Sequence, residues 1–388
     1  PPRHSTRRQR QMCIRDRFGP VQKVGYMPDS FGHIAQMPQL LRRAGIDSFV
    51  YTRGNGDELD TLGLEYTWSA PDGSEVLAVN QWGGYCNAAA LGLAELWHAF
   101  TRRDVCRDRA VDKVGKLLEE VGKRSNCGVL LLNNGCDHHP PQKEFGPILN
   151  SLREAYPDVE FTHGSLGEYV AAVRDAGAAR KTYEGDLIGG RYHHILSGVW
   201  SARMGLMQQN DAAETLLSSY VEPVTAYAHF LHDRPYPHGL IEYSWKLLMK
   251  NHPHDSICGC STDEVHREME PRFAGVRDTG EQVMSVELEH LAPAFARKAD
   301  DDDDTVVCVV NTLPFKRTEV IERLVNEFPD KAAKLLGVPN DERLPVRILQ
   351  VLDEAAQMTT ALPTWLEKPA PPTPAVSGTL DDVIVRRR

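Results

Sequence analysis

Two aspartates each follow a segment that predicts a buried strand. Asp29 comes shortly after residues 21–26, and Asp137 comes shortly after the largely apolar residues 127–135. Parallel α/β folds bind ligands at the carboxyl ends of their strands, where a carboxyl group can serve as acid, base or nucleophile. Both aspartates are therefore candidates for catalysis, although Asp137 could instead cap a turn. His138 is a candidate substrate-binding residue that could tune Asp137, and contact with solvent at the rim of the site is the alternative.

A third candidate lies in the segment NHPHDSICGCS of residues 251–261. Pro253 ends the preceding helical pattern, because proline lacks a backbone donor and restricts the residue before it. His254 and Asp255 are therefore expected at a helix end. Imidazole and carboxylate groups are common ligands of a catalytic zinc ion, and a surface or capping role is the alternative.

Strand and helix patterns alternate from residue 18 to about residue 185. Strands are predicted at residues 21–26, 46–51, 74–82 and 127–135, and helices at residues 34–44, 111–124 and 145–157. This alternation predicts an α/β domain of barrel-like parallel strands at residues 18–185, in which residues 127–135 form a central strand.

Residues 186–299 have a different pattern, with three long helical stretches and few strand signals. The stretches are residues 211–232, 239–252 and 261–297, and they predict a three-helix bundle. The acidic residues 300–304 are interpreted as a solvated linker or helix tail. Residues 305–388 are predicted to be the start of a β-sandwich domain that is cut short.

The arginine-rich residues 1–17 do not resemble the rest of the chain. They show no strand or helix pattern, and their piece MCIRDR resembles a translated sequencing adapter. We therefore interpret them as a non-native arm and leave them out of the fold prediction. A basic arm that binds nucleic acid is the alternative.

The composition is that of an ordinary globular protein. The chain of 388 residues has a net charge of −10 and no basic stripe after residue 17, which argues against a nucleic-acid partner. No apolar run approaches the roughly 20 residues that a membrane helix requires. The eight cysteines are scattered without CxxC spacing, which predicts reduced thiols and a cytoplasmic protein rather than a disulfide framework.

Several motifs occur together and in a fixed order, and their combination resembles glycoside hydrolase family 38, the α-mannosidases. The resemblance covers residues 18–315 and is strongest to the bacterial members, among them the mannosylglycerate hydrolases. The motifs are PDSFGH at 28–33, TRG at 52–54, NNGCDHHPPQ at 133–142, GGRYHHILSGVWSAR at 189–203 and NHPHDSICGCSTDEVHRE at 251–268.

The resemblance implies a retaining exo-mannosidase with defined roles for its motif residues. Asp29 would be the nucleophile, Asp137 the general acid/base, and Arg53 would hydrogen-bond to the nucleophile. Retaining glycosidases use two carboxyls about 5–5.5 Å apart, and the acid must hold its proton until the leaving group takes it.

The resemblance also implies a zinc ion, with Asp29 and His254 as ligands and Asp255 lining the sugar pocket. The zinc would bind the vicinal hydroxyls of mannose and fix the ring. Members of the family carry an upstream H-x-D motif that supplies two further ligands, and nothing in this sequence matches it. The sequence therefore predicts half a metal site, missing ends, weak zinc binding and little turnover.

The predicted function is the hydrolysis of terminal α-mannosides of small molecules or oligosaccharides, in a bacterial cytoplasm. Hydrolysis of mannosylglycerate or phosphomannosylglycerate is the alternative within this class. A carbohydrate-binding or scaffold protein that lost the metal, and a zinc-dependent deacetylase-like barrel, are alternatives from other classes. The sequence leaves open whether the protein forms a homo-oligomer.

Overall fold

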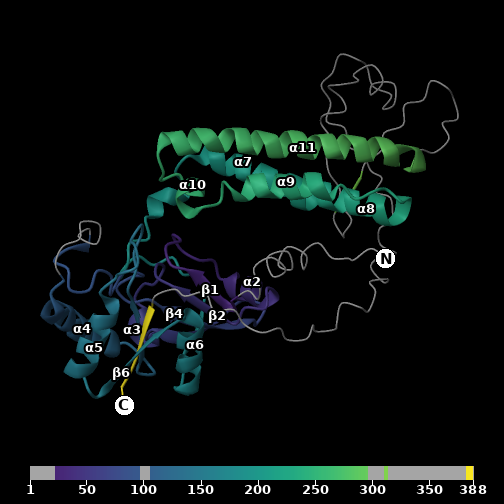
Figure 1. Cartoon of the computed structure of the whole chain (residues 1–388). Coiled ribbons are helices and arrows are strands. Elements are labelled where there is room, and N and C mark those ends of the chain that lie inside the picture. Colours follow the sequence, from purple (N-terminus) through teal and green to yellow (C-terminus); the bar gives the residue numbers. More distant parts are fainter. Residues whose placement is uncertain (1–21, 97–104, 296–309, 313–381, 388) are drawn as a thin grey trace, which may run out of the picture. The chain divides into compact units, whose positions relative to one another are not determined.

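The computed structural model describes residues 22–96, 105–295, 310–312 and 382–387. It consists of two compact units (Figure 1). The first unit extends to Gly198 and includes the last strand of the chain, and the second unit begins at Val199. Within the described residues, each helix is too short or too polar to span a bilayer.

A five-stranded sheet forms the first part of the α/β unit. β1, β2 and β4 run parallel to one another, β3 pairs antiparallel with β4, and β7 pairs parallel with β3. The strands are β1 (Val24–Met27), β2 (Ser48–Tyr51), β3 (Glu65–Ser69), β4 (Glu75–Asn80) and β7 (Thr182–Glu184). The sheet is open, so the predicted barrel-like arrangement is wrong for the described strands.

The parallel strands are positioned by the burial of apolar side chains. All four residues of β2 are buried, as expected for a strand covered on both faces. Helix α2 (Met37–Arg43) connects β1 to β2, starts with a proline in its first turn and ends before Gly45, which has a φ of 77°. The short α3 (Leu59–Leu62) follows β2.

A second sheet has three strands in the order β5, β8, β6. These strands are β5 (Val129–Asn133), β6 (Val159–Gly164) and β8 (Asp382–Arg387). β8 pairs antiparallel with both neighbours. β5 was predicted to be central in a parallel sheet, and that prediction is wrong because its described neighbour is antiparallel. β8 comes from residues 305–388, which were predicted to begin a separate domain.

Three helices cover these strands. They are α4 (Arg107–Gly122), α5 (Phe145–Ala155) and α6 (Leu166–Asp175). α4 and α5 share a buried core cluster with Leu130 and Leu132 of β5. The opposite face of β5 packs with Val50 of β2 and with Tyr169 of α6. The two sheets and their helices therefore build one α/β unit.

The second unit is helical, as predicted (Figure 1). Its elements are η2 (Ser197–Trp200, which starts just before the unit boundary), α7 (Met204–Thr215), the π-helical turn η3 (Leu216–Val221), α8 (Glu222–His232), α9 (His238–Met249), α10 (His254–Ile257) and α11 (Asp263–Phe295). α7, η3 and α8 are continuous and pack with α9 and α11. The core of this bundle contains Leu217, Leu248, Met269 and Phe273, all nearly inaccessible to solvent.

Candidate functional site

Asp29 and Arg53 lie together at the carboxyl ends of two adjacent parallel strands. Asp29 follows β1, Arg53 follows β2, and the register pairs Met27 with Tyr51. Arg53 Nε donates to Asp29 Oδ1 at 2.7 Å, and Nη2 lies 2.5 Å from the same oxygen. The Asp29 side chain is 20% exposed and the Arg53 side chain is 14% exposed, so the contact is partly shielded from water. This is the contact that the resemblance implies.

Further contacts hold the Arg53 guanidinium in place. Nη1 donates to the backbone oxygen of His194 at 2.5 Å, and the guanidinium carbon lies 5.3 Å from the ring centre of Phe31. The planar fork of the guanidinium is suited to contacts in several directions. The segment around His194 therefore helps to orient the group that binds Asp29.

Asp137 follows β5 and is bound by a residue that the sequence analysis did not identify. Tyr85, in the loop after β4, donates its phenolic hydrogen to Asp137 Oδ2 at 2.9 Å. Burial is the largest cause of a raised pKa for Tyr85, and the bond to Asp137 and the charges of Asp29 and Asp137 add to it. The charges of both carboxylates and of Arg53 thus act on the Tyr85 phenol. One region of the first unit therefore contains Asp29, Arg53, Tyr85 and Asp137.

His193 lies in the same region and, like Tyr85, was not predicted from the sequence. Burial is the largest cause of its lowered pKa, the charge of Arg53 lowers it further, and the charge of Asp29 acts in the opposite direction. A Cβ atom on Gly84 would lie 3.3 Å from Cε1 of His193, so the two loops approach closely. His193 belongs to the family motif at residues 189–203, for which no role in the site was predicted from the sequence.

His138 has an unusual backbone conformation and an exposed side chain. Its φ is 61°, in the left-handed region that residues with a Cβ atom rarely adopt. Within the described ranges, no hydrogen bond or ion pair assigns His138 a role in tuning Asp137. Its predicted role as a substrate-binding residue stays a prediction.

The structure corrects the prediction that the cysteines are reduced. Cys86 and Cys136 form a disulfide with their Cα atoms 4.8 Å apart. The prediction failed because the two residues are separated by 50 positions, and only the meeting of the loops after β4 and β5 brings them together. Four other described cysteines are free: Cys106, Cys127, Cys258 and Cys260.

The other two predicted site residues belong to the second unit. His254 and Asp255 begin α10, as the predicted helix end requires. Their side chains are 41% and 57% exposed, and His254 Nε2 lies 3.7 Å from Asp255 Oδ1. Cys260 Sγ donates to Asp255 Oδ1 at 3.2 Å. Burial and this hydrogen bond raise the pKa of the Cys260 thiol to about 11.

The described residues do not complete a zinc site. A catalytic zinc ion usually takes three protein ligands. No group of three histidine, cysteine, aspartate or glutamate side chains in the described ranges could hold a metal ion. The oxygen of Asp29 that faces Arg53 is already engaged by two guanidinium nitrogens.

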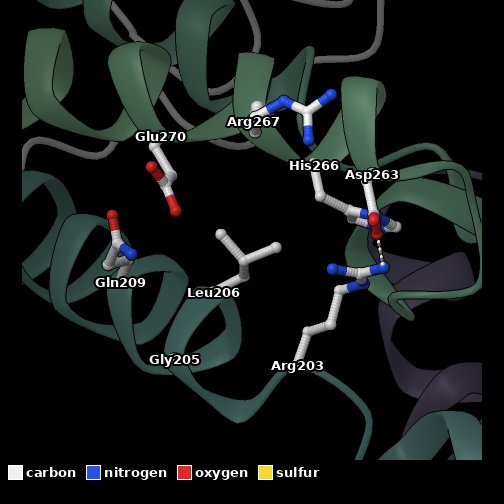
Figure 2. Close-up of a pocket in the computed structure, with 8 residues that line it drawn as sticks. All are labelled: Arg203, Gly205, Leu206, Gln209, Asp263, His266, Arg267 and Glu270. Carbon is white, nitrogen blue, oxygen red and sulfur yellow. Dashed lines mark hydrogen bonds and ion pairs between the residues drawn. The ribbon is translucent and has the colours of Figure 1, made fainter.

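A pocket of about 430 Å³ lies between α7 and α11 of the helical unit (Figure 2). The ion pair between Arg203 and Asp263, with its atoms 2.5 Å apart, borders one side, and Glu270 and Gln209 point toward one another across the other. The lining residues are Arg203, Gly205, Leu206, Gln209, Asp263, His266, Arg267 and Glu270. None of the predicted site residues is among them.

Comparison with known families gives two matches along the chain. The model for the Glycosyl hydrolases family 38 N-terminal domain matches residues 7–187 and therefore begins inside the predicted non-native arm. The model for the Alpha mannosidase middle domain matches residues 194–291. The first match contains Asp29, Arg53 and Asp137, and the second contains His254 and Asp255.

Individual relatives agree with these matches. A protein of Halalkalibacterium halodurans that carries the provisional name mannosylglycerate hydrolase is 31% identical over 84% of this chain and 38% of its own length. Alpha-mannosidase 2C1 of Mus musculus is 25% identical over 78% of this chain and 27% of its own length. The crystal structure of an α-mannosidase from Enterococcus faecalis V583 has 29% identity and a TM-score of 0.64, over 72% of this chain and 31% of that one.

The chain thus spans 38% of the bacterial relative and 27% of the mouse relative. Within that span, two domain models of one family follow each other in order, and they cover the α/β unit and the helical unit in turn. The chain belongs to glycoside hydrolase family 38, the family of the α-mannosidases.

Proposed function

We propose that the protein hydrolyses terminal α-D-mannosides with retention of configuration, using Asp29 as nucleophile and Asp137 as general acid/base. The observation that carries the proposal is a pair of carboxyls, each with its own hydrogen-bond donor. Arg53 donates to Asp29 and Tyr85 donates to Asp137, and the charges of both carboxylates act on the Tyr85 phenol. Two carboxyls in one region, each oriented by its own donor, suit the two-step chemistry of a retaining glycosidase.

In the first step, a carboxylate oxygen of Asp29 attacks the anomeric carbon of the mannoside. The bond from that carbon to the leaving-group oxygen breaks, and this oxygen takes the proton of Asp137. The products are the free aglycone alcohol and a mannosyl ester of Asp29. Arg53 keeps one oxygen of Asp29 bound at 2.7 Å, which orients the carboxylate before attack.

In the second step, Asp137 accepts a proton from a water molecule whose oxygen attacks the anomeric carbon. The ester bond to Asp29 breaks and releases both the carboxylate and mannose. Two inversions at the same carbon restore the original α configuration. Tyr85 donates to one oxygen of Asp137 and leaves the other oxygen to exchange the proton in both steps.

The remaining site residues keep the roles that the family resemblance implies. His254 and Asp29 would be ligands of a zinc ion, and Asp255 and His138 would contact the sugar. A zinc ion would supply a template for the vicinal hydroxyls of mannose when it is bound.

The proposal is tested with aryl α-mannosides at high protein concentration, with added zinc and with a chelator in parallel. We expect mannose to be released first as the α anomer, as followed by NMR. Asp29→Asn should lower kcat/KM by about 10³-fold or more, because the nucleophile is lost. Asp158→Asn changes an exposed aspartate between α5 and β6 in the same way and serves as the matched control.

Other outcomes would point to another function. Release of the β anomer, or an Asp29→Asn variant as active as the control, would contradict the proposed mechanism. Mannose binding without hydrolysis in either metal condition would favour the carbohydrate-binding alternative.

Hydrolysis of mannosylglycerate is a second candidate, favoured by the 31% identity to the Halalkalibacterium halodurans protein with that provisional name. It uses the same residues and differs only in the aglycone. A comparison of kcat/KM for mannosylglycerate, its phosphorylated form and an aryl mannoside decides between them. A preference of at least tenfold for mannosylglycerate or its phosphorylated form would support this candidate.

A further inference from the structure

Two loops of the first unit carry Tyr85 and Asp137: the tyrosine loop, residues 81–91, and the acid loop, residues 134–142. Asn87 of the tyrosine loop binds β5: its Nδ2 donates to the backbone oxygen of Leu131 at 3.2 Å, and its Oδ1 accepts from the backbone nitrogen of Asn133 at 2.8 Å. At the base of the acid loop, Asn134 Nδ2 donates to the backbone oxygen of Ala88 at 2.8 Å. These hydrogen bonds fix the acid loop where it leaves β5.

Tyr85 and Asp137 themselves are joined in two ways. One is their hydrogen bond of 2.9 Å, and the other is the disulfide between Cys86 and Cys136. Cys86 directly follows Tyr85, and Cys136 directly precedes Asp137. The covalent bond therefore lies one residue from each partner of the hydrogen bond.

The local sequence gives these positions little rigidity of their own. Gly83 and Gly84 precede Tyr85 with φ values of 76° and 86°, and a Cβ atom on Gly135 of the acid loop would meet open space. Glycine has the largest conformational freedom to lose on ordering. Asp137 is exposed, and a hydrogen bond accessible to water contributes little net stability. A covalent link is thus the stronger constraint on the pair.

We propose that the Cys86–Cys136 disulfide positions Asp137 against Tyr85, and that its reduction weakens Asp137 as a proton donor. The inference rests on the function proposed above. Both cysteines are half-buried and so remain within reach of a small thiol. A dithiol reductant transfers two electrons and two protons to the disulfide; the sulfur–sulfur bond breaks, two protein thiols form, and the dithiol becomes a cyclic disulfide.

The test compares two aryl α-mannosides before and after reduction with dithiothreitol. A substrate with a very acidic phenol leaves without protonation, whereas one with a weakly acidic phenol needs the proton of Asp137. General acid catalysis contributes about 10²–10⁴-fold, so a loosened acid should lower kcat/KM, which reports the loss of the phenol in the first step, by about tenfold or more for the second substrate. The first substrate should change less than about twofold. Equal losses on both substrates, or no loss, would overturn the inference.

Two variants separate positioning from general loss of structure. Cys106→Ser removes an exposed free thiol and should respond to the reductant like the unchanged protein. Tyr85→Phe keeps the disulfide but removes the hydrogen bond, so reduction should then have a smaller effect on the weakly acidic substrate. An undiminished effect of reduction in Tyr85→Phe would show that the disulfide does not act through this pair.

Hydrogen exchange provides a measurement that needs no turnover. Peptide mapping of the unreduced protein should recover the Cys86–Cys136 link, and reduction should speed exchange in the tyrosine and acid loops but not in α11. Recovery of both cysteines as free thiols, or unchanged exchange, would overturn the inference. If exchange responds while neither substrate is hydrolysed, the disulfide still fixes the loops and the proposed function is the part that fails.

Discussion

The segment DSFGH supplies two side chains with opposite surroundings. Asp29 is bound by a guanidinium group at the edge of the sheet. His33, four residues later, is only 3% exposed and is packed edge-on against the rings of Phe49 and Tyr51, at 5.0 and 5.4 Å. Neither ring nitrogen of His33 has a hydrogen-bond partner in the described part of the chain. This histidine behaves as an apolar ring that positions the segment behind Asp29.

The pH dependence of stability should report on His33. Burial lowers its pKa to about 4 from a usual value of 6.5. Between these two pH values the unfolded chain binds more protons than the folded protein. The stability that the protein gains from a neutral His33 is therefore complete above pH 6.5 and is lost as the pH falls toward 4. The loss in the free energy of unfolding should be about 3 kcal/mol. His33→Phe should remove that part of the acid sensitivity, measured by urea unfolding at pH 7 and pH 4.5.

The control is His290→Phe, the same change at an exposed position of α11. It should leave the difference between the two pH values as it is in the unchanged protein. If His33→Phe and His290→Phe show the same acid sensitivity, His33 is not neutral in the folded state.

The sequence motifs identified one half of the candidate site better than the other. Asp29 and Arg53 follow successive parallel strands, and that arrangement made their proximity predictable from the family motifs. Tyr85 and the Cys86–Cys136 link escaped because they depend on a meeting of loops 50 or more positions apart. The GGYC segment has no periodic pattern that would mark it.

At the scale of elements, apolar runs predicted where strands lie but not how they pair. Residues 46–51 and 74–82 contain β2 and β4, and these are parallel neighbours. β3 was not predicted, although two of its central residues, Tyr66 and Trp68, are fully buried. The pairing of β8 with β5 also joins distant segments. Register and strand order depend on such long-range contacts, which a local pattern does not encode.

The start of α6 is stabilised by a capping box in which both hydrogen bonds are present. The Ser165 side chain accepts from the backbone nitrogen of Glu168 at 3.3 Å, and Glu168 Oε2 accepts from the backbone nitrogen of Ser165 at 2.7 Å. Both satisfy donors that a helix start otherwise leaves without a partner. Ser165→Ala should therefore lower the free energy of unfolding by about 1 kcal/mol.

Ser151→Ala is the matched control for this helix cap. Its hydroxyl donates to the backbone oxygen of Pro147 inside α5, and such a bond adds little to a helix. Urea unfolding followed through the first unit measures both variants. If the cap stabilises α6, Ser165→Ala should lose more free energy of unfolding than Ser151→Ala. Equal urea midpoints for the two variants would show that packing alone stabilises α6.

At the scale of the whole molecule, the buried residues form separate clusters in the two units of the chain. The clusters around Leu130, Val50 and Trp68 draw on the α/β unit, and the cluster around Phe273 draws on the helical unit. Each unit therefore has a hydrophobic core of its own, the property expected of a domain that folds by itself. Asp29 belongs to the first unit and His254 to the second.

Separate cores predict separate responses to core mutations. Phe273 is 2% exposed and Leu152 is 1% exposed, so truncating either leaves a cavity that costs about 2–5 kcal/mol. Phe273→Ala should speed hydrogen exchange in α7, α9 and α11 and leave β2 and β4 protected, whereas Leu152→Ala should do the reverse. Because global unfolding would speed exchange everywhere, a uniform response to either variant would mean that the two units unfold as one cooperative body.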